Sequence, residues 1–262
     1  MHALATSFLA LYLAHLVTDF VLQSDRVVVR KRRGSVLAYL EHGGIHLFAA
    51  VLFLGFAIPR LWGNLRFYGV IIALTLVHLG IDWCKVVLVR SKKVADEAMA
   101  FFGDQAVHFV TVGIAAWLIA QPLAASLVSK ARSIQSEIEK PLLLLVMYVG
   151  VIFGGGYVVR FLTRPLVRRN VEVVGETTDE LENAGMYIGW LERFIVLTSL
   201  VLQSPATVGL ILTAKSIARY PELKSVRFAE YFLIGTLLSV TIGILGGLIL
   251  LKAFYGTVTL GK

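Results

Sequence analysis

Long apolar segments dominate this sequence and limit the folds open to it. Hydrophobic residues form 57% of the chain, whereas charged residues form only 16%. The apolar segments are residues 3–24, 36–58, 66–89, 101–121, 141–163, 181–203, 205–219 and 228–252. A helix needs about 20 apolar residues to cross the hydrocarbon core of a bilayer. We therefore predict an all-α, polytopic transmembrane helix bundle with about eight spans. The seventh segment is the shortest, so a re-entrant path is the alternative for it.

The whole chain, residues 1–262, is expected to form a single integral membrane domain with two helical halves. The first half, residues 1–121, contains all six histidines, and residues 141–262 form the second half. Between them, residues 122–140 mix charged and apolar side chains, which suits a short amphipathic helix on the outer surface. The only cysteine, Cys84, excludes a disulfide within the chain.

The net charge of +8 is distributed in a way that indicates a membrane rather than nucleic acid. Seventeen of the 25 basic residues lie in or beside alternate connections between the apolar segments, at residues 26–33, 85–93, 160–169 and 215–227. Basic residues are concentrated in the cytoplasmic loops of membrane proteins. We therefore place these connections in the cytoplasm and both termini outside it. The expected partner is the lipid bilayer, and no nucleic acid is needed to explain the charge.

Polar residues four positions apart recur in the first four apolar segments. The pairs are His15 with Asp19, His42 with His46, His78 with Asp82, and Asp104 with His108, and Gln23 extends the first pair by one turn on the same face. A spacing of four places both side chains on one face of a helix. Because the spans alternate in direction, all four pairs are expected at similar depths in the cytoplasmic leaflet.

Such ionisable groups are costly inside a membrane unless they are paired, hydrated or bound to an ion. Imidazoles and carboxylates that converge from separate helices are typical ligands of divalent first-row metals such as Zn, Fe or Mn. The predicted metal ligands are His15, Asp19, His42, His46, His78, Asp82, Asp104 and His108. The alternative is that these groups only hydrogen-bond to one another and hold the helices together.

Further polar residues are candidates for catalysis or substrate binding. The candidate catalytic carboxylates are Asp19, Asp104 and Glu192, and the candidate substrate-binding residues are Gln23, Arg193, Lys215 and Glu230. Guanidinium and ammonium groups suit an anionic small molecule or lipid headgroup. The alternative for the residues of the second half is a set of interhelical ion pairs.

Several spaced motifs resemble the bacterial integral-membrane family called domain-of-unknown-function family 3307. In the first half the motifs are His15-Leu-Val-Thr-Asp19-Phe-Val-Leu-Gln23-Ser-Asp25, His46, His78-x3-Asp82-x2-Lys85 and Asp104-Gln105-x2-His108. In the second half they are Gly185-x3-Gly189-x2-Glu192-Arg193, Ala214-Lys215-Ser216 and Ala229-Glu230-Tyr231. The resemblance implies a protein of the bacterial inner (plasma) membrane and supplies no reaction.

Three functions fit these observations, and the sequence alone does not choose among them. The preferred one is a metal-dependent hydrolase, in which the metal lowers the pKa of a bound water and a nearby Asp or His moves the proton. The second is a divalent-metal or proton transporter, which needs a path on both sides of the membrane. The third is a non-catalytic membrane module with a structural polar layer.

Overall fold

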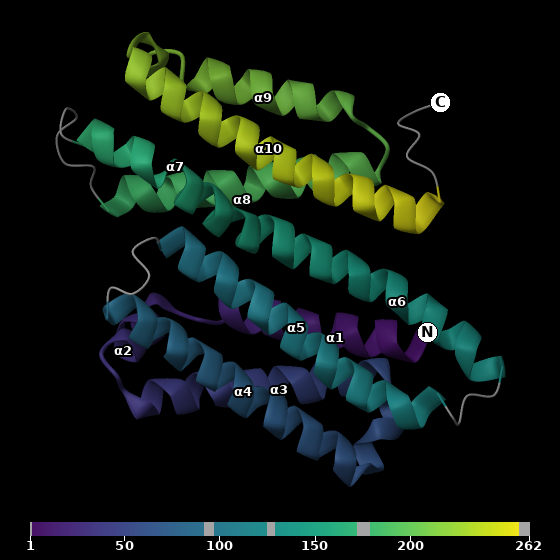
Figure 1. The fold of residues 1–262 in the computed structure, drawn as a ribbon. Coiled ribbons are helices and arrows are strands. Elements are labelled where there is room, and N and C mark those ends of the chain that lie inside the picture. Colours follow the sequence, from purple (N-terminus) through teal and green to yellow (C-terminus); the bar gives the residue numbers. More distant parts are fainter. Residues whose placement is uncertain (1, 92–96, 125–128, 172–178, 257–262) are drawn as a thin grey trace. The chain divides into compact units, whose positions relative to one another are not determined.

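The computed structural model describes residues 2–91, 97–124, 129–171 and 179–256, and within these ranges the chain is helical and has no strands (Figure 1). The all-α prediction is therefore confirmed for the described residues. They form two compact units, Met1–Val149 and Gly150–Lys262. The boundary between the units falls inside the fifth predicted span.

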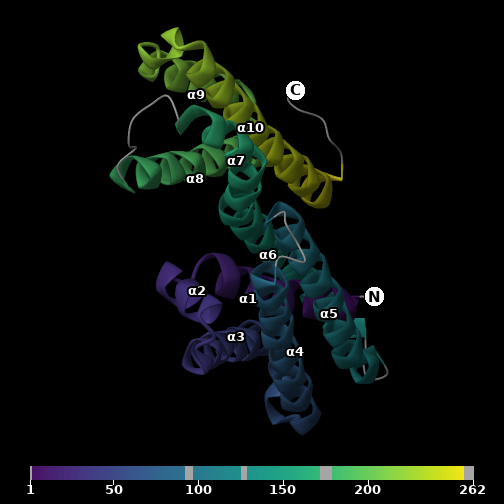
Figure 2. The same ribbon diagram turned by 60° about the vertical axis from the view of Figure 1, so that its left-hand side comes forward.

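The described residues of the first unit form six α-helices, and one of them, α1, is central. The helices are α1 (His2–Phe20), α2 (Asp25–Arg32), α3 (Val36–Ala57), α4 (Leu65–Arg90), α5 (Glu97–Ala124) and α6 (Ser129–Val149), with a 3-10 turn, η1 (Pro59–Gly63), after α3. Helix α1 packs against α3, α5 and α6, and α4 packs against α3 and α5 (Figures 1 and 2). Because α1 is central, α3 and α5 both pack against it, and their polar side chains reach those of α1.

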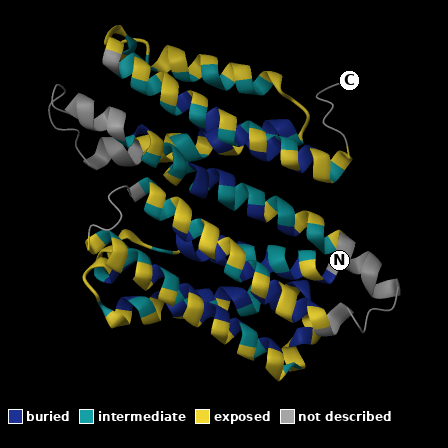
Figure 3. Cartoon of the chain, in the orientation of Figure 1, coloured by how far each residue is buried: buried dark blue, intermediate teal, exposed yellow. Residues whose placement is uncertain are grey.

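Small side chains explain why α1 can take the central position. Ala10 and Ala14 are fully buried, so neighbouring helices approach closely, as is common between membrane helices. In contrast, α3 and α4 expose large apolar residues such as Phe48, Phe56 and Leu76 (Figure 3). In a membrane these faces contact lipid, which removes them from water.

The connection after α1 differs from its prediction. Helix α1 ends at Phe20 rather than near residue 24, and the basic connection forms α2, which packs against α3 and α4. The prediction of a plain loop here is wrong because Val27 supplies an apolar contact and Lys31, one turn later, is also buried. Gln23 consequently lies outside α1, and its place on the α1 face was wrongly predicted.

The predicted surface segment, residues 122–140, belongs to two longer helices. Helix α5 continues to Ala124, and residues 129–140 form the first turns of α6, while residues 125–128 lie outside the described residues. The chain from residue 129 therefore continues into the fifth predicted span without a break. The location of this segment on the outer surface stays a prediction.

The described residues of the second unit form a π-helical turn, four α-helices and a 3-10 turn. In chain order these are η2 (Gly150–Gly154), α7 (Gly155–Val171), α8 (Asp179–Val201), α9 (Ala206–Ala218), η3 (Glu222–Lys224) and α10 (Val226–Tyr255). Helix α10 packs against α7 and α8, and α9 packs against α8. Residues 172–178 lie outside the described residues.

Six helical stretches of the described chain are long and apolar enough to cross a membrane. They are Ala3–Phe20, Val36–Ala57, Leu65–Arg90, Ala98–Gln121, Glu137–Arg164 and Phe228–Tyr255. Helix α9 is apolar but has only 13 residues, or about 20 Å at about 1.5 Å per residue. That is shorter than a hydrocarbon core of about 30 Å. The chain is thus a multi-pass helical membrane protein, and the finer count of about eight spans is not confirmed.

Candidate metal centre

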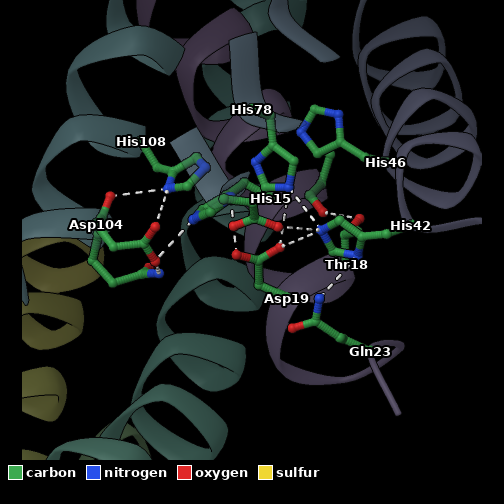
Figure 4. A network of polar contacts seen from close by, with 12 residues as sticks. His15, Thr18, Asp19, Gln23, His42, His46, His78, Asp104 and His108 are labelled. Carbon is green, nitrogen blue, oxygen red and sulfur yellow. Dashed lines mark hydrogen bonds and ion pairs between the residues drawn. The ribbon is translucent and has the colours of Figure 1, made fainter. Parts of the chain in front are cut away.

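Four helices of the first unit carry the predicted ligands into one buried network (Figure 4). Helices α1, α3, α4 and α5 each contribute one of the four pairs. The five histidines are at most 1% exposed, and the three aspartates at most 9%. Because each pair occupies one helix face, packing the four helices together gathers all eight side chains.

Three of these side chains lie close enough together to hold one ion. The Nε2 atoms of His42 and His78 share a hydrogen bond of 2.8 Å, and Asp19 Oδ1 lies 3.3 Å from the first and 3.4 Å from the second. An ion at about 2.0–2.1 Å from tetrahedral ligands requires those ligands to lie about 3.3 Å apart. Asp19 Oδ1 is buried and accepts no hydrogen bond of acceptable geometry. We call Asp19, His42 and His78 the ligand triangle.

Two further groups extend from the ligand triangle through shared residues. His15, His78 and His108 form one group, and Asp82, Asp104 and His108 form the other, each with ligand atoms within 4.8 Å of one another. His78 therefore belongs to two groups, and His108 also belongs to two. Together the three groups form a continuous series of possible ligand positions.

Hydrogen bonds fix the orientation of His15 and His108. His108 Nδ1 lies 2.9 Å from the backbone oxygen of Asp104 and donates to it, which leaves Nε2 with a free lone pair. Gln105 Nε2 donates to Asp104 Oδ2. The amide oxygen of Gln105 therefore faces His15 Nε2 and accepts a hydrogen bond from it. His15 Nδ1 and His108 Nε2 are both buried without a hydrogen-bond partner. Such outer hydrogen bonds commonly orient histidines that bind metals.

His46 has a different position from the other predicted ligands. Its ring stacks on His78 with the ring centres 4.3 Å apart, and its Nδ1 lies 3.0 Å from Thr75 Oγ1. It takes part in none of the three groups within the described residues. The geometry gives His46 a supporting contact with His78, and its role as a ligand stays a prediction.

Two lysines, neither among the predicted site residues, enter the network. Lys31 Nζ donates to Asp82 Oδ2, and Lys85 Nζ donates to Asp104 Oδ2 at 2.7 Å. Lys31 resembled the exposed arginines around it, and only its spacing of four from Val27 indicated a buried face. Lys85 lies three residues after Asp82, so its helix face was a usable signal.

The network carries a net negative charge that a cation would offset. Three aspartates and two lysines give a net charge of −1 when the histidines are neutral. A buried charge without compensation is costly. A proton on one histidine or a bound cation would offset it, so the network is suited to hold either.

The polar residues of the second unit make their own contacts. Lys215 Nζ donates to Glu192 Oε2 at 2.8 Å. Arg193 is 3% exposed, and its Nε and Nη2 donate to the backbone oxygen of Ile152 at 3.0 and 2.8 Å. Ile152 lies in the π-helical turn, where the regular pattern of backbone hydrogen bonds is displaced. Glu230 is exposed.

Glycines make the space for Arg193. A Cβ atom at Gly156 would lie 2.8 Å from Arg193 Nη2, and one at Gly189 would lie 3.2 Å from Arg193 Nη1. The Gly154–Gly156 run thus permits close packing of α7 on α8. Arg193 and Lys215 were predicted to bind an anionic substrate, and within this unit both also make structural contacts.

Comparison with known families supports the resemblance seen in the sequence. Residues 7–136 match the family described as "Protein of unknown function (DUF3307)". These residues belong to the DUF3307 family. The DUF3307 segment includes all four polar pairs and both site lysines, whereas the similarity of the second half lies outside the matched residues. No curated protein and no solved structure matches the chain.

Proposed function

We propose that the DUF3307 segment binds a divalent first-row metal ion, Zn, Fe or Mn, through Asp19, His42 and His78. The observation that carries this proposal is the ligand triangle, in which the two separations from Asp19 Oδ1, 3.3 and 3.4 Å, match the edge between tetrahedral ligands. The third, 2.8 Å, is a hydrogen bond between the two imidazoles that an ion would replace. A divalent cation would also satisfy the buried Asp19 Oδ1 atom, which accepts no hydrogen bond.

Gln23 orients His42 from outside the triangle. Its amide nitrogen lies 3.2 Å from His42 Nδ1. Coordination through His42 Nε2 requires the proton on Nδ1, so metal binding would turn the Gln23 amide over to present its oxygen there. The nitrogen and oxygen of an amide exchange places by a simple rotation. We therefore assign Gln23 to the support of His42 as a ligand.

The activity that we propose for this centre is hydrolysis of an anionic substrate. A metal ion of this kind lowers the pKa of its bound water to about 7. Lys85 has a side chain that is 35% exposed, so its ammonium group is available at the edge of the network to attract an anion. Asp104 Oδ1 is buried without a hydrogen-bond partner, which makes it the candidate proton acceptor.

Transport is the second candidate, and the overlap of the three groups favours it. His78 and His108 are each shared by two groups, so a metal ion or a proton could pass from one set of ligands to the next. Transport through a relay of buried ionisable groups is common in membrane proteins.

An assay of the native protein in liposomes separates these functions. Hydrolysis of inner-leaflet phospholipids or soluble phosphoesters is expected, while metal-sensitive and pH-sensitive dyes inside the liposomes report no flux. Asp19→Asn should lose the hydrolysis because it removes a ligand. Flux without hydrolysis would replace the hydrolase with the transporter. A protein with neither activity would be a non-catalytic module.

We further propose that the protein lies in the bacterial inner membrane with α2 on the cytoplasmic side. A Cys84→Ala protein with Arg32→Cys should resist a membrane-impermeant maleimide in intact cells, whereas Arg60→Cys should react. Arg32 and Arg60 are both exposed, and they lie beyond opposite ends of α3. Labelling is measured by a mass shift, and lysed cells provide the control in which both sites react. Labelling of Arg32→Cys in intact cells would reverse the topology.

A further inference from the structure

Lys31 is a buried cation in a basic segment whose arginines are exposed or half-buried. It is 4% exposed, whereas Arg26, Arg32 and Arg33 are exposed. Its ammonium group lies 5.6 Å from the centre of the Tyr39 ring and donates to Asp82 Oδ2. Placing an ammonium at this depth is costly unless a carboxylate is fixed beside it. The general positive charge of this segment therefore does not explain why Lys31 is buried beside Asp82.

Asp82 lies beside the ligand triangle but outside its group of ligand atoms. Its Oδ2 atom, which accepts from Lys31, is 3.4 Å from His42 Nε2. This separation is close to the edge of about 3.3 Å between tetrahedral ligands. Without Lys31, Asp82 could complete a set of four protein ligands with the ligand triangle.

The number of protein ligands separates structural metal sites from catalytic ones. Four protein ligands close a tetrahedral site, whereas three leave a position for water or substrate. We propose that Lys31 is a positioning residue that holds Asp82 away from the ion and thereby keeps one coordination position open to water. This inference rests on the proposed function, because it concerns the same metal centre.

The second lysine provides an internal comparison. Lys85 makes the same type of contact, at 2.7 Å, with Asp104 Oδ2. Asp104 is not part of the ligand triangle, and within the described residues it shares no group with Asp19, His42 or His78. Removal of Lys85 therefore also removes a positive charge but frees no carboxylate beside His42.

The test uses Mn²⁺ as the probe and the full-length protein in detergent. Water-proton relaxation measures whether the bound Mn²⁺ keeps an exchangeable water, and a titration gives its Kd. In Lys31→Met the Kd for Mn²⁺ should fall by at least about tenfold. The reason is that the positive charge of Lys31 is lost beside the ion and the Asp82 carboxylate becomes a ligand. The exchangeable water should also disappear. Lys85→Met should retain the water.

Two additional variants complete the test. Lys31→Met/Asp82→Leu has no free carboxylate beside His42, so the exchangeable water should return. If Lys31→Met does not fold, Lys31→Ala replaces it, since its short side chain leaves space for water and has no donor that could hold Asp82. The same loss of metal-bound water is expected in Lys31→Ala.

The outcomes distinguish this inference from the proposed function. If the native protein binds no Mn²⁺, Zn²⁺ or Fe²⁺, the metal centre itself is wrong and the inference falls with it. If the native protein binds Mn²⁺ with an exchangeable water and the Lys31 variants keep that water, only the role of Lys31 is overturned. Loss of water in the Lys31 variants alone supports it.

Discussion

Asp19→Asn should remove the bound metal from the purified protein. The substituted amide would retain the shape of the side chain but lose the charge that faces His42 and His78 at 3.3 and 3.4 Å. Replacing outer-sphere partners of metal sites already lowers affinity by about 10–100-fold, so loss of a carboxylate ligand should cost at least about 100-fold. Elemental analysis after detergent purification, with a competition titration for Kd, measures the effect.

The same substitution at an exposed aspartate supplies the control. Asp25 begins α2 and is exposed, so Asp25→Asn should retain the native metal content. Two stacked histidines provide a second comparison, because His46 and His78 are each 1% exposed. His78→Leu should lose the metal, whereas His46→Leu should retain most of it. Full metal content in Asp19→Asn and His78→Leu would leave the network as a structural polar layer.

Asp82→Leu should strongly destabilise the protein because it leaves the Lys31 ammonium group buried without its carboxylate. Lys31 and Asp82 are only 4% and 5% exposed. Breaking a buried ion pair by removing one partner typically costs about 3–5 kcal/mol. The free energy of unfolding can be measured by titration with SDS, with a chelator present so that metal binding does not contribute.

Removing both charges should recover most of this loss. The apolar side chains of Lys31→Met/Asp82→Leu need no compensating charge, and replacement of a whole buried ion pair by apolar residues is often close to neutral. The double variant should therefore be more stable than either Asp82→Leu or Lys31→Met. A double variant as unstable as Asp82→Leu would show that packing at Asp82, rather than the ion pair, determines the stability.

Much of the polar network was predictable because a helix has a fixed period. Residues four apart share a face, so His15 with Asp19 and Asp104 with His108 were placed correctly on single helices. Long apolar segments likewise indicated the helices that carry them. The amide of Gln23 was expected to extend the face of α1, but the chain leaves α1 at Phe20 and Gln23 reaches His42 from the following connection.

Composition alone indicates that this chain is a helical membrane protein, and spacing along single helices places ionisable pairs inside its first four apolar segments. The packing of the helices is what makes Asp19, His42 and His78 a triangle, stacks His46 beside it and turns Lys31 inward to Asp82. These contacts join residues from different helices, and their distances depend on how the helices pack, which no local period of the sequence specifies.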